Sequence, residues 1–196
     1  MSRTLSVRNR QRVRRVNTPL LRCITLHVLD EQLRIDDFEL AIHLVAAPEM
    51  AEVNWNFLQH EGSTDVITFD YSDPVAADVR RLSNQNHSSM KRSKPPHAGS
   101  YQSLHGELFI CLDDAEKQAH TFRTTWQNEL TRYVIHGLLH LCGHDDLQPA
   151  ARRKMKREEN RLLRETTKRF VLAKLETRNP KRSTPKSAFR VPRSAI

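Results

Sequence analysis

The amino-acid sequence predicts a small α+β domain, because four short segments with the pattern of β-strands are interspersed with five segments with the pattern of helices. The strand-like segments alternate apolar and polar residues or are continuously apolar. The helix-like segments repeat apolar residues at intervals of three and four. The chain has 196 residues, which suits one domain with extensions.

The N-terminal half of the chain supplies three of the expected strands and two of the helices. Thr18 and Pro19 form a helix-start signal in which Thr18 is the N-cap, and this helix should reach about residue 29. Pro48 opens the second helix, which should end near residue 58. The strands are expected at residues 4–9, as a short edge strand, and at 38–46 and 65–71.

The C-terminal half supplies the fourth strand and three helices. Asp113 or Asp114 should cap the first of these helices, since aspartate is a favoured N-cap residue. Gly143 should end the second, because glycine is common directly after helix ends. The expected elements are a strand at 104–112 and helices at 113–121, 125–142 and 149–172.

Two segments have an amino-acid composition that does not favour a packed hydrophobic core. Residues 72–103 are rich in Ser, Asn, His, Lys and Pro, and predict a long polar loop inserted in the domain. We expect its histidines, His87 and His97, to be solvated rather than metal ligands. Residues 173–196 carry three prolines among Arg and Lys, and predict a basic, disordered tail after a domain at 1–172.

Charge is distributed unevenly along the chain. Residues 1–22 carry +7 and residues 151–196 carry +12, whereas residues 23–150 carry −10. Basic ends can simply keep a protein in solution, but ends as concentrated as these favour a polyanionic partner such as a nucleic acid.

The cysteines and the apolar runs indicate the compartment. Cys23, Cys111 and Cys142 are widely spaced and odd in number, which argues against a disulfide framework, and we expect all three to be buried and unreactive. No run of about 18 apolar residues could cross a membrane. The Arg-rich N-terminus lacks the apolar core of a secretory signal, although a transit peptide would also be rich in Arg. We therefore expect a cytoplasmic protein.

The most informative stretch runs from His136 to Asp146 and reads His-Gly-Leu-Leu-His-Leu-Cys-Gly-His-Asp-Asp. His136 and His140 are four residues apart on an expected helix, so both imidazoles face the same side, where one metal ion can bind them. Two histidines at this spacing can also be packing residues. The apolar helix around them makes unpaired polar groups costly, and this favours the metal site.

A third ligand would come from the residues after Gly143, where the chain can turn back on the helix. His144, Asp145 and Asp146 are all candidates. The spacing is similar to that of zinc peptidases, but those enzymes place a glutamate base directly after the first histidine. Gly137 occupies this position, so a zinc metallopeptidase is the weaker enzyme hypothesis.

Three motifs in order resemble the YbeY endoribonuclease family, over about residues 20–170. The family's Thr-Asp-Val-Leu-Ser-Phe strand is similar to residues 64–69, and its Gly-Asp/Glu-Ile strand is similar to residues 106–110. The family signature His-Gly-x-Leu-His-Leu-x-Gly-Tyr-Asp-His is similar to residues 136–146. Asn54 matches the asparagine that precedes the family's usual arginine.

Three positions depart from the family pattern. His144 replaces a tyrosine, Asp146 replaces the third histidine, and Leu58 replaces the arginine. The resemblance makes Asp146 our third ligand, because it holds the family's ligand position. His144 is the alternative, since imidazole is the commoner zinc donor. Because Leu58 cannot contact a phosphate as an arginine would, the basic ends or Arg123 and Arg132 are candidates for holding RNA.

The resemblance implies a zincin-like mixed sheet with the metal helix packed on it. It also implies a single-strand-specific, metal-dependent endoribonuclease in ribosomal RNA maturation, with small-subunit 3′-end processing as the usual assignment, and in ribosome quality control. We expect His136, His140 and Asp146 to hold one zinc ion, or another divalent metal, with a catalytic water in the fourth position. No residue is an obvious general base, and Asp145 could orient a ligand imidazole. A non-catalytic alternative is a zinc-stabilised ribosome-binding protein, whose ion would be enclosed by four ligands.

Overall fold

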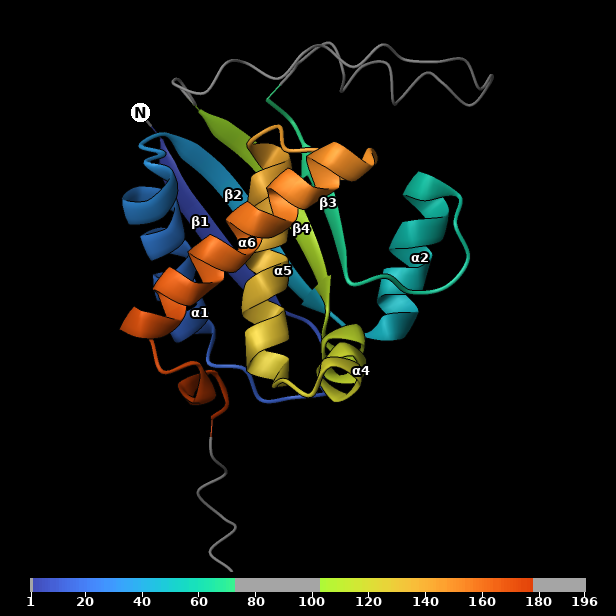
Figure 1. Cartoon of the computed structure of the whole chain (residues 1–196). Helices are drawn as coiled ribbons and strands as arrows, with labels where there is room; N and C mark the ends of the chain where they lie inside the picture. The colour runs from blue at the N-terminus through green and yellow to red at the C-terminus, as the bar shows by residue number, and fades with distance from the viewer. Residues whose placement is uncertain (1, 73–102, 178–196) are drawn as a thin grey trace, which may run out of the picture.

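The protein is described by a computed structural model over residues 2–72 and 103–177. A four-stranded mixed sheet and five α-helices make up this part of the chain (Figure 1), which confirms the α+β prediction. In the sheet order β1-β2-β4-β3, the first three strands are parallel and β3 is antiparallel to β4. The strand bounds are β1 Arg3–Asn9, β2 Phe38–Val45, β3 Val66–Asp70 and β4 Leu104–Cys111. The prediction that β1 is an edge strand is confirmed.

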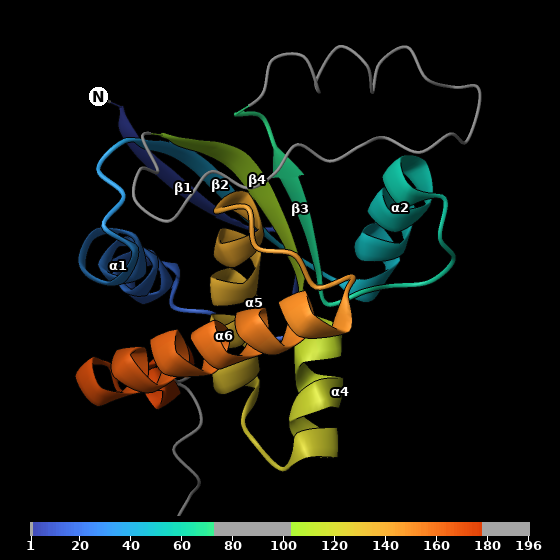
Figure 2. The same cartoon turned by 45° about the horizontal axis from the view of Figure 1, so that its top comes forward.

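The helices cover the sheet unequally. Helices α1 and α5 pack on one face, and α6 lies across the outer side of α5 (Figures 1 and 2). Helix α2 lies beside β3 and contacts β4 through the other face. The helix bounds are α1 Thr18–His27, α2 Ala47–Leu58, α4 Leu112–Phe122, α5 Trp126–Leu141 and α6 Pro149–Arg169. A π-helical segment, Val28–Leu33, extends α1, and a short 3-10 helix, Leu172–Leu175, follows α6.

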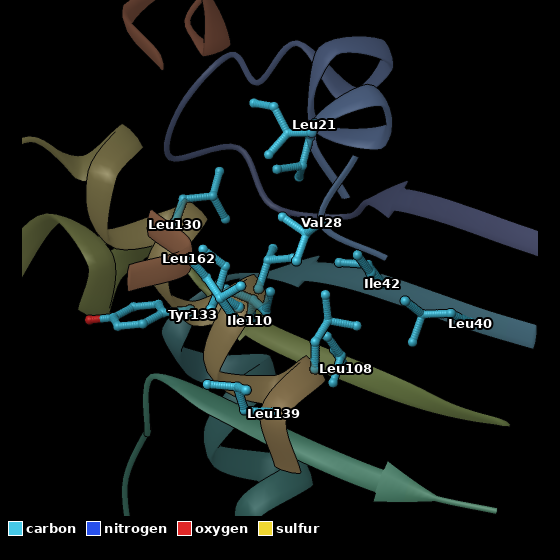
Figure 3. Packing of buried hydrophobic residues seen from close by; sticks show 14 of the residues in the cluster. Leu21, Val28, Leu40, Ile42, Leu108, Ile110, Leu130, Tyr133, Leu139 and Leu162 are labelled. Carbon is cyan, nitrogen blue, oxygen red and sulfur yellow. The ribbon is translucent and has the colours of Figure 1, made fainter. Parts of the chain in front are cut away.

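The main core lies between the sheet and the layer of α1 and α5. The register pairs Ile42 of β2 with Leu108 of β4, and both are fully buried. Figure 3 shows Val28 of the helical layer beside Ile42, and Leu139 of α5 belongs to the same cluster. Burying such side chains contributes about 1.5–3 kcal/mol each, so this cluster holds α5 on the sheet.

Two glycines allow α5 to lie unusually close to β4. A Cβ atom at Gly137 would lie 2.6 Å from Cδ2 of Leu108. A Cβ atom at Gly106 would lie 2.5 Å from the carbonyl oxygen of Phe69 and 2.7 Å from Cδ2 of Leu141. Because real Cβ atoms do not approach other atoms so closely, a side chain at Gly137 would displace Leu108, and one at Gly106 would displace β3 or Leu141 of α5.

Two predicted helix caps are wrong. Asn17, not Thr18, caps α1, and its side chain accepts a hydrogen bond of 3.1 Å from the backbone N–H of Leu20. Asparagine is at least as good an N-cap as threonine, and here it precedes it. Neither Asp113 nor Asp114 caps α4, because both lie within its first turn. Asp113 instead accepts a hydrogen bond of 2.7 Å from the backbone N–H of Ala47, which ties α4 to the start of α2.

The fold continues past the predicted start of the tail at residue 173. Helix α6 ends at Arg169, and Leu172 and Leu175 are buried in the 3-10 helix that follows. The backbone N–H of Asn17 donates a hydrogen bond of 2.7 Å to the carbonyl of Leu175. Residues 173–177 are therefore part of the folded domain.

The remaining predictions for the loop and the tail concern residues outside the described part of the chain. The predicted polar loop at 72–103, with His87 and His97, lies almost entirely at 73–102, and the rest of the tail lies at 178–196. Among the described residues, no helix is both long and apolar enough to span a bilayer.

The expectation of three buried cysteines is correct for two of them. Cys111 and Cys142 are buried, and burial raises the pKa of each thiol to about 12. Cys23 is exposed, because it lies on the outer side of α1, whose buried residues are Leu21, Ile24 and Thr25.

Candidate metal centre

Helix α5 presents His136 and His140 from its C-terminal half. The helix starts at a Thr125 cap, whose hydroxyl accepts a hydrogen bond of 3.3 Å from the backbone N–H of Asn128. It ends at Leu141, and Gly143 follows with a φ of +78°, a conformation that favours glycine. The chain turns there, so that the residues after Gly143 return to the side of α5 that carries the two histidines.

Three of the predicted ligands come together at this point. His136, His140 and Asp146 each offer one ligand atom, and these atoms lie within 4.8 Å of one another. The two Nε2 atoms are 3.1 Å apart, and Oδ2 of Asp146 is 4.0 Å from Nε2 of His136. Because zinc binds nitrogen and oxygen donors at about 2.0–2.2 Å, donors at these separations can share one ion.

The hydrogen bonds of the two imidazoles decide which nitrogens carry protons. Nδ1 of His136 lies 3.1 Å from a carboxylate oxygen of Glu159, and Nδ1 of His140 lies 3.1 Å from the backbone carbonyl of His144. Both partners only accept hydrogen bonds, so each Nδ1 must be the protonated nitrogen. In the neutral rings, each Nε2 then carries a lone pair that points toward the other.

Two lone pairs at 3.1 Å repel each other unless a cation lies between them. Burial, and then the neighbouring His136, lower the pKa of His140, which favours the neutral ring that binds metals. The geometry of this chain's own residues therefore fits a bound metal ion.

Glu159 of α6 contacts His136 at Nδ1, the ring nitrogen that faces away from the proposed metal position. Its side chain accepts hydrogen bonds from His136, from Lys156 at 2.8 Å and from Arg132. Burial alone would raise the pKa of Glu159, but the hydrogen bonds from His136, Lys156 and Arg132 outweigh it and lower the pKa to about 2. An ionised carboxylate at this point fixes the orientation of the ring and increases the basicity of its other nitrogen.

Sequence reasoning missed Glu159, although a signal was present. The apolar stripe of α6 contains Met155, Leu162 and Leu163, and Glu159 lies on the same stripe at helical spacing. An acidic residue on the buried side of a helix must have partners, and this is the pattern that could have identified it.

The structure also places the other predicted site residues. The imidazole of His144 is not in the three-residue group, and this residue contributes its carbonyl instead. The orienting role suggested for Asp145 is filled by Glu159 and by that carbonyl, whereas Asp145 accepts a hydrogen bond from the backbone N–H of Leu147. Arg132 contacts Glu159 and Asn160, so its guanidinium serves the site from inside the protein.

A cavity of about 480 Å³ opens beside His136, between α4, α5 and α6. Phe122, at the end of α4, is 69 % exposed at this cavity. The other lining residues are Asp65, Gln118, Thr124, Glu129, Arg132, Tyr133, His136, Lys156, Glu159 and Asn160.

Position 137 explains why the site differs from that of a peptidase. Gly137 faces Leu108 of the sheet, so a glutamate there would be directed into the core. The base that zinc peptidases place after the first histidine is thus absent from the sequence and excluded by the packing.

Comparison with known proteins identifies the family. The family model described as Endoribonuclease YbeY matches residues 6–167. An Endoribonuclease YbeY from Salinibacter ruber is 30 % identical over 160 residues, which cover 81 % of this chain and 89 % of the relative. The chain belongs to the YbeY endoribonuclease family. The prediction of a hydrolase that acts on RNA phosphodiester bonds is confirmed by this membership.

One further relative agrees with this assignment, and one solved structure shares the fold. The Endoribonuclease YbeY from Parabacteroides distasonis is 36 % identical over 115 residues, which cover 59 % of this chain and 62 % of that protein. The solution structure of TM1509 from Thermotoga maritima superimposes with a TM-score of 0.55 at 22 % identity, over 91 % of this chain and 99 % of that one. This last likeness supports the fold.

Proposed function

We propose that this YbeY family member is a metal-dependent endoribonuclease that cleaves single-stranded RNA in ribosomal RNA maturation, at a metal ion held by His136, His140 and Asp146. The observation that carries the proposal is the pair of Nε2 lone pairs that face each other beside the Asp146 carboxylate. Zinc is the ion we favour, since two imidazoles and one carboxylate are common donors for it. The basic ends of the sequence support binding to ribosomal RNA. Action in the cytoplasm, at the ribosome and in ribosome quality control is part of the same proposal.

The bound ion would polarise a phosphoryl oxygen of RNA and lower the pKa of a water molecule. His136 and His140 would hold it through Nε2, and Asp146 through its carboxylate. A carboxylate reduces the positive charge of the site compared with a third imidazole, and suits harder divalent metals slightly better. Glu159 keeps the Nδ1 proton of His136 in place, so that Nε2 remains available.

The exposure of the three residues supports a catalytic site over a structural one. The side chain of His136 is 24 % exposed and that of Asp146 is 36 % exposed. A structural zinc site is closed by four protein ligands, whereas a catalytic site keeps a position for water or substrate. Within the described residues the metal-binding group has three members, which leaves such a position.

The cavity beside His136 supports RNA as the substrate. Its volume of about 480 Å³ can accept a nucleotide, and Phe122 offers an aromatic face on which a base can stack. Stacking of this kind needs a base that is not paired in a duplex, which agrees with a preference for single strands.

RNA cleavage by matched histidine variants tests the proposal. Wild-type protein, His140→Ala and His120→Ala are each incubated with a single-stranded RNA and with the same RNA annealed to its complement. His120 is an exposed histidine of α4 and serves as the control. We expect wild type and His120→Ala to cleave the single-stranded RNA faster than the annealed RNA. His140→Ala should cleave neither. Cleavage that survives in His140→Ala would overturn the metal mechanism.

A further inference from the structure

We propose that the exposed side of α6 is a docking surface for the phosphate backbone of the RNA, and that it leads the strand to the metal centre. The proposal rests on the proposed function, because it names where that RNA lies outside the cleavage point. We call this side the basic surface of α6. Its residues are Arg153, Lys154, Arg157, Arg161, Arg164 and Lys168.

The charge of α6 is strongly one-sided. The helix contains nine Lys and Arg residues and three Glu residues. One of these acids, Glu159, is buried against α5 and does not reduce the charge at the surface. Glu158 pairs with Arg161, and Glu165 pairs with Lys168. The exposed side of α6 therefore keeps a large positive excess.

This arrangement costs helix stability. The first turn of α6 contains no acidic residue; Arg152 lies in it, and Arg153 follows directly after it. Basic residues at a helix N-terminus oppose its dipole by about 0.3–1 kcal/mol each. Arg153 and Arg157 also repel each other at a spacing of four residues. Selection for stability alone would place acids at these positions, so the charges indicate a polyanionic ligand.

The position of the basic surface connects it with the metal centre. The first turn is joined to the ligand loop, because Arg152 donates a hydrogen bond of 2.9 Å to the backbone carbonyl of Asp146. From there α6 runs across α5 and away from the site (Figure 2). The stretch from Arg153 to Lys168 is about 22 Å long at 1.5 Å per residue, which is enough for several consecutive phosphates.

The distribution of apolar residues favours RNA over a membrane as the occupant. A helix that lies on a bilayer exposes large apolar side chains between its cations. In α6 the large apolar residues, Met155, Leu162 and Leu163, are buried against the domain. The exposed residues of α6 are therefore suited to the phosphate groups of RNA and not to lipid tails. Binding through phosphates would be independent of RNA sequence and sensitive to salt.

The test reverses three charges on the basic surface, in the variant Arg153→Glu, Arg157→Glu and Arg164→Glu. The control variant, Arg34→Glu and Lys117→Glu, reverses charges at exposed residues outside α6 and outside both basic ends of the sequence, and losses of binding are compared per reversed charge. Both are made in the full chain, and thermal unfolding checks that they fold. An acid at position 153, close to the N-terminus of α6, is favoured by the helix dipole, and the unfolding temperatures show whether weaker binding in either variant reflects unfolding.

Binding of a fluorescent single-stranded RNA is measured at several salt concentrations between about 50 and 200 mM. We expect the α6 variant to bind at least 10-fold more weakly at the lowest salt, with the salt slope reduced by about 2, since each lost phosphate contact removes about 0.7. In cleavage assays its KM should rise while kcat stays within about two-fold, because the metal centre is unchanged.

An unchanged salt slope in the α6 variant, or an equal loss of binding in the control variant, would overturn the proposal. Vesicles containing phosphatidylserine are the second ligand, and their binding to both variants is measured in the same way. Loss of vesicle binding with RNA binding intact would assign the surface to membranes and contradict the proposal. The outcomes distinguish the two proposals. RNA binding through α6 without any cleavage by wild type would contradict only the proposed cleavage at the metal centre. Cleavage by the α6 variant with an unchanged KM would contradict only the docking surface.

Discussion

Two glutamates on facing helices are almost equally buried, yet their acidities shift in opposite directions. Glu129 of α5 is 4 % exposed and Glu159 of α6 is 3 % exposed. Burial raises the pKa of Glu129, and the cations Arg132 and Lys156 only partly offset it. For Glu159, burial also acts to raise the pKa, but hydrogen bonds from His136, Lys156 and Arg132 lower it to about 2.

The difference shows that direct hydrogen bonds, more than burial, decide the charge at this site. Arg132 lies near both carboxylates, but it donates a hydrogen bond to Glu159, while its Nε is 3.5 Å from Oε2 of Glu129. Glu159 is therefore ionised beside the metal-binding histidine. Glu129, in the same cavity, is held closer to its neutral form. The centre thus takes its ligands from α5 and its supporting charge from α6.

The strongest way to break this contrast is Glu159→Gln. This change keeps the shape of the side chain but removes the charge that orients His136, so we expect metal affinity to fall about 10- to 100-fold. Arg132, which is partly buried, also loses its charged partner, whereas the exposed Lys156 can be solvated, so the free energy of unfolding should fall by about 1.5–3 kcal/mol. Metal titration and chemical denaturation of the same samples measure both effects.

Glu158→Gln is the matched control for this prediction. Glu158 is the neighbouring residue, but it forms an exposed ion pair with Arg161 and has no contact with His136. Exposed ion pairs contribute about 0–1 kcal/mol to the free energy of unfolding, so stability should change little. Because Glu158 does not contact His136, metal affinity should stay at the wild-type value. Equal losses in the two variants would show that α6 acts through its general charge and not through Glu159.

The second prediction concerns the packing of α5 on the sheet. This packing determines the position of His136 relative to Glu159. In Gly137→Ala, the new methyl group would overlap Leu108, and we expect a loss of about 1–3 kcal/mol in the free energy of unfolding. Leu108→Val in the same protein should recover part of this loss, since it makes room for the methyl group. Additive effects of the two changes in a double-mutant cycle would mean that the two residues are not in contact.

The smallest effect is expected for Glu129→Gln, and it should have the opposite sign. Burial raises the folded-state pKa of Glu129 above its ordinary value of 4.5, so stability present below pH 4.5 is lost as the pH rises through the folded-state pKa. Glutamine does not ionise, and should increase stability at pH 7 by about 0.5–1 kcal/mol. The gain should vanish below about pH 4.5, where wild type is protonated. A lower stability of the variant at pH 7 would show that Glu129 is ionised and favourably paired.

The sequence was sufficient for those features that depend on neighbours along the chain. The spacing of His136 and His140, the turn at Gly143 and the period of each strand are local, and the structure agrees with them. The cap of α1 was displaced by one residue, because Asn17 and Thr18 are both good caps and only the fold decides between them.

Features that depend on contacts between distant segments could not be read in the same way. Glu159 lies 23 residues after His136, and no local pattern links the two. The burial of Leu175 depends on the start of α1, at the other end of the domain. Gly137 was recognised as the absence of a peptidase base, but its contact with Leu108 follows only from the packing of α5 on β4.

The most direct test of the metal centre is the zinc stoichiometry of purified wild-type protein, Asp146→Ala and His144→Ala, each equilibrated with the same limiting concentration of free zinc. The side chain of Asp146 lies in the three-residue group, whereas His144 contributes a backbone carbonyl. We predict about one ion per chain in wild type and in His144→Ala, and a large loss in Asp146→Ala. Full occupancy in Asp146→Ala together with a loss in His144→Ala would contradict the proposed ligand set.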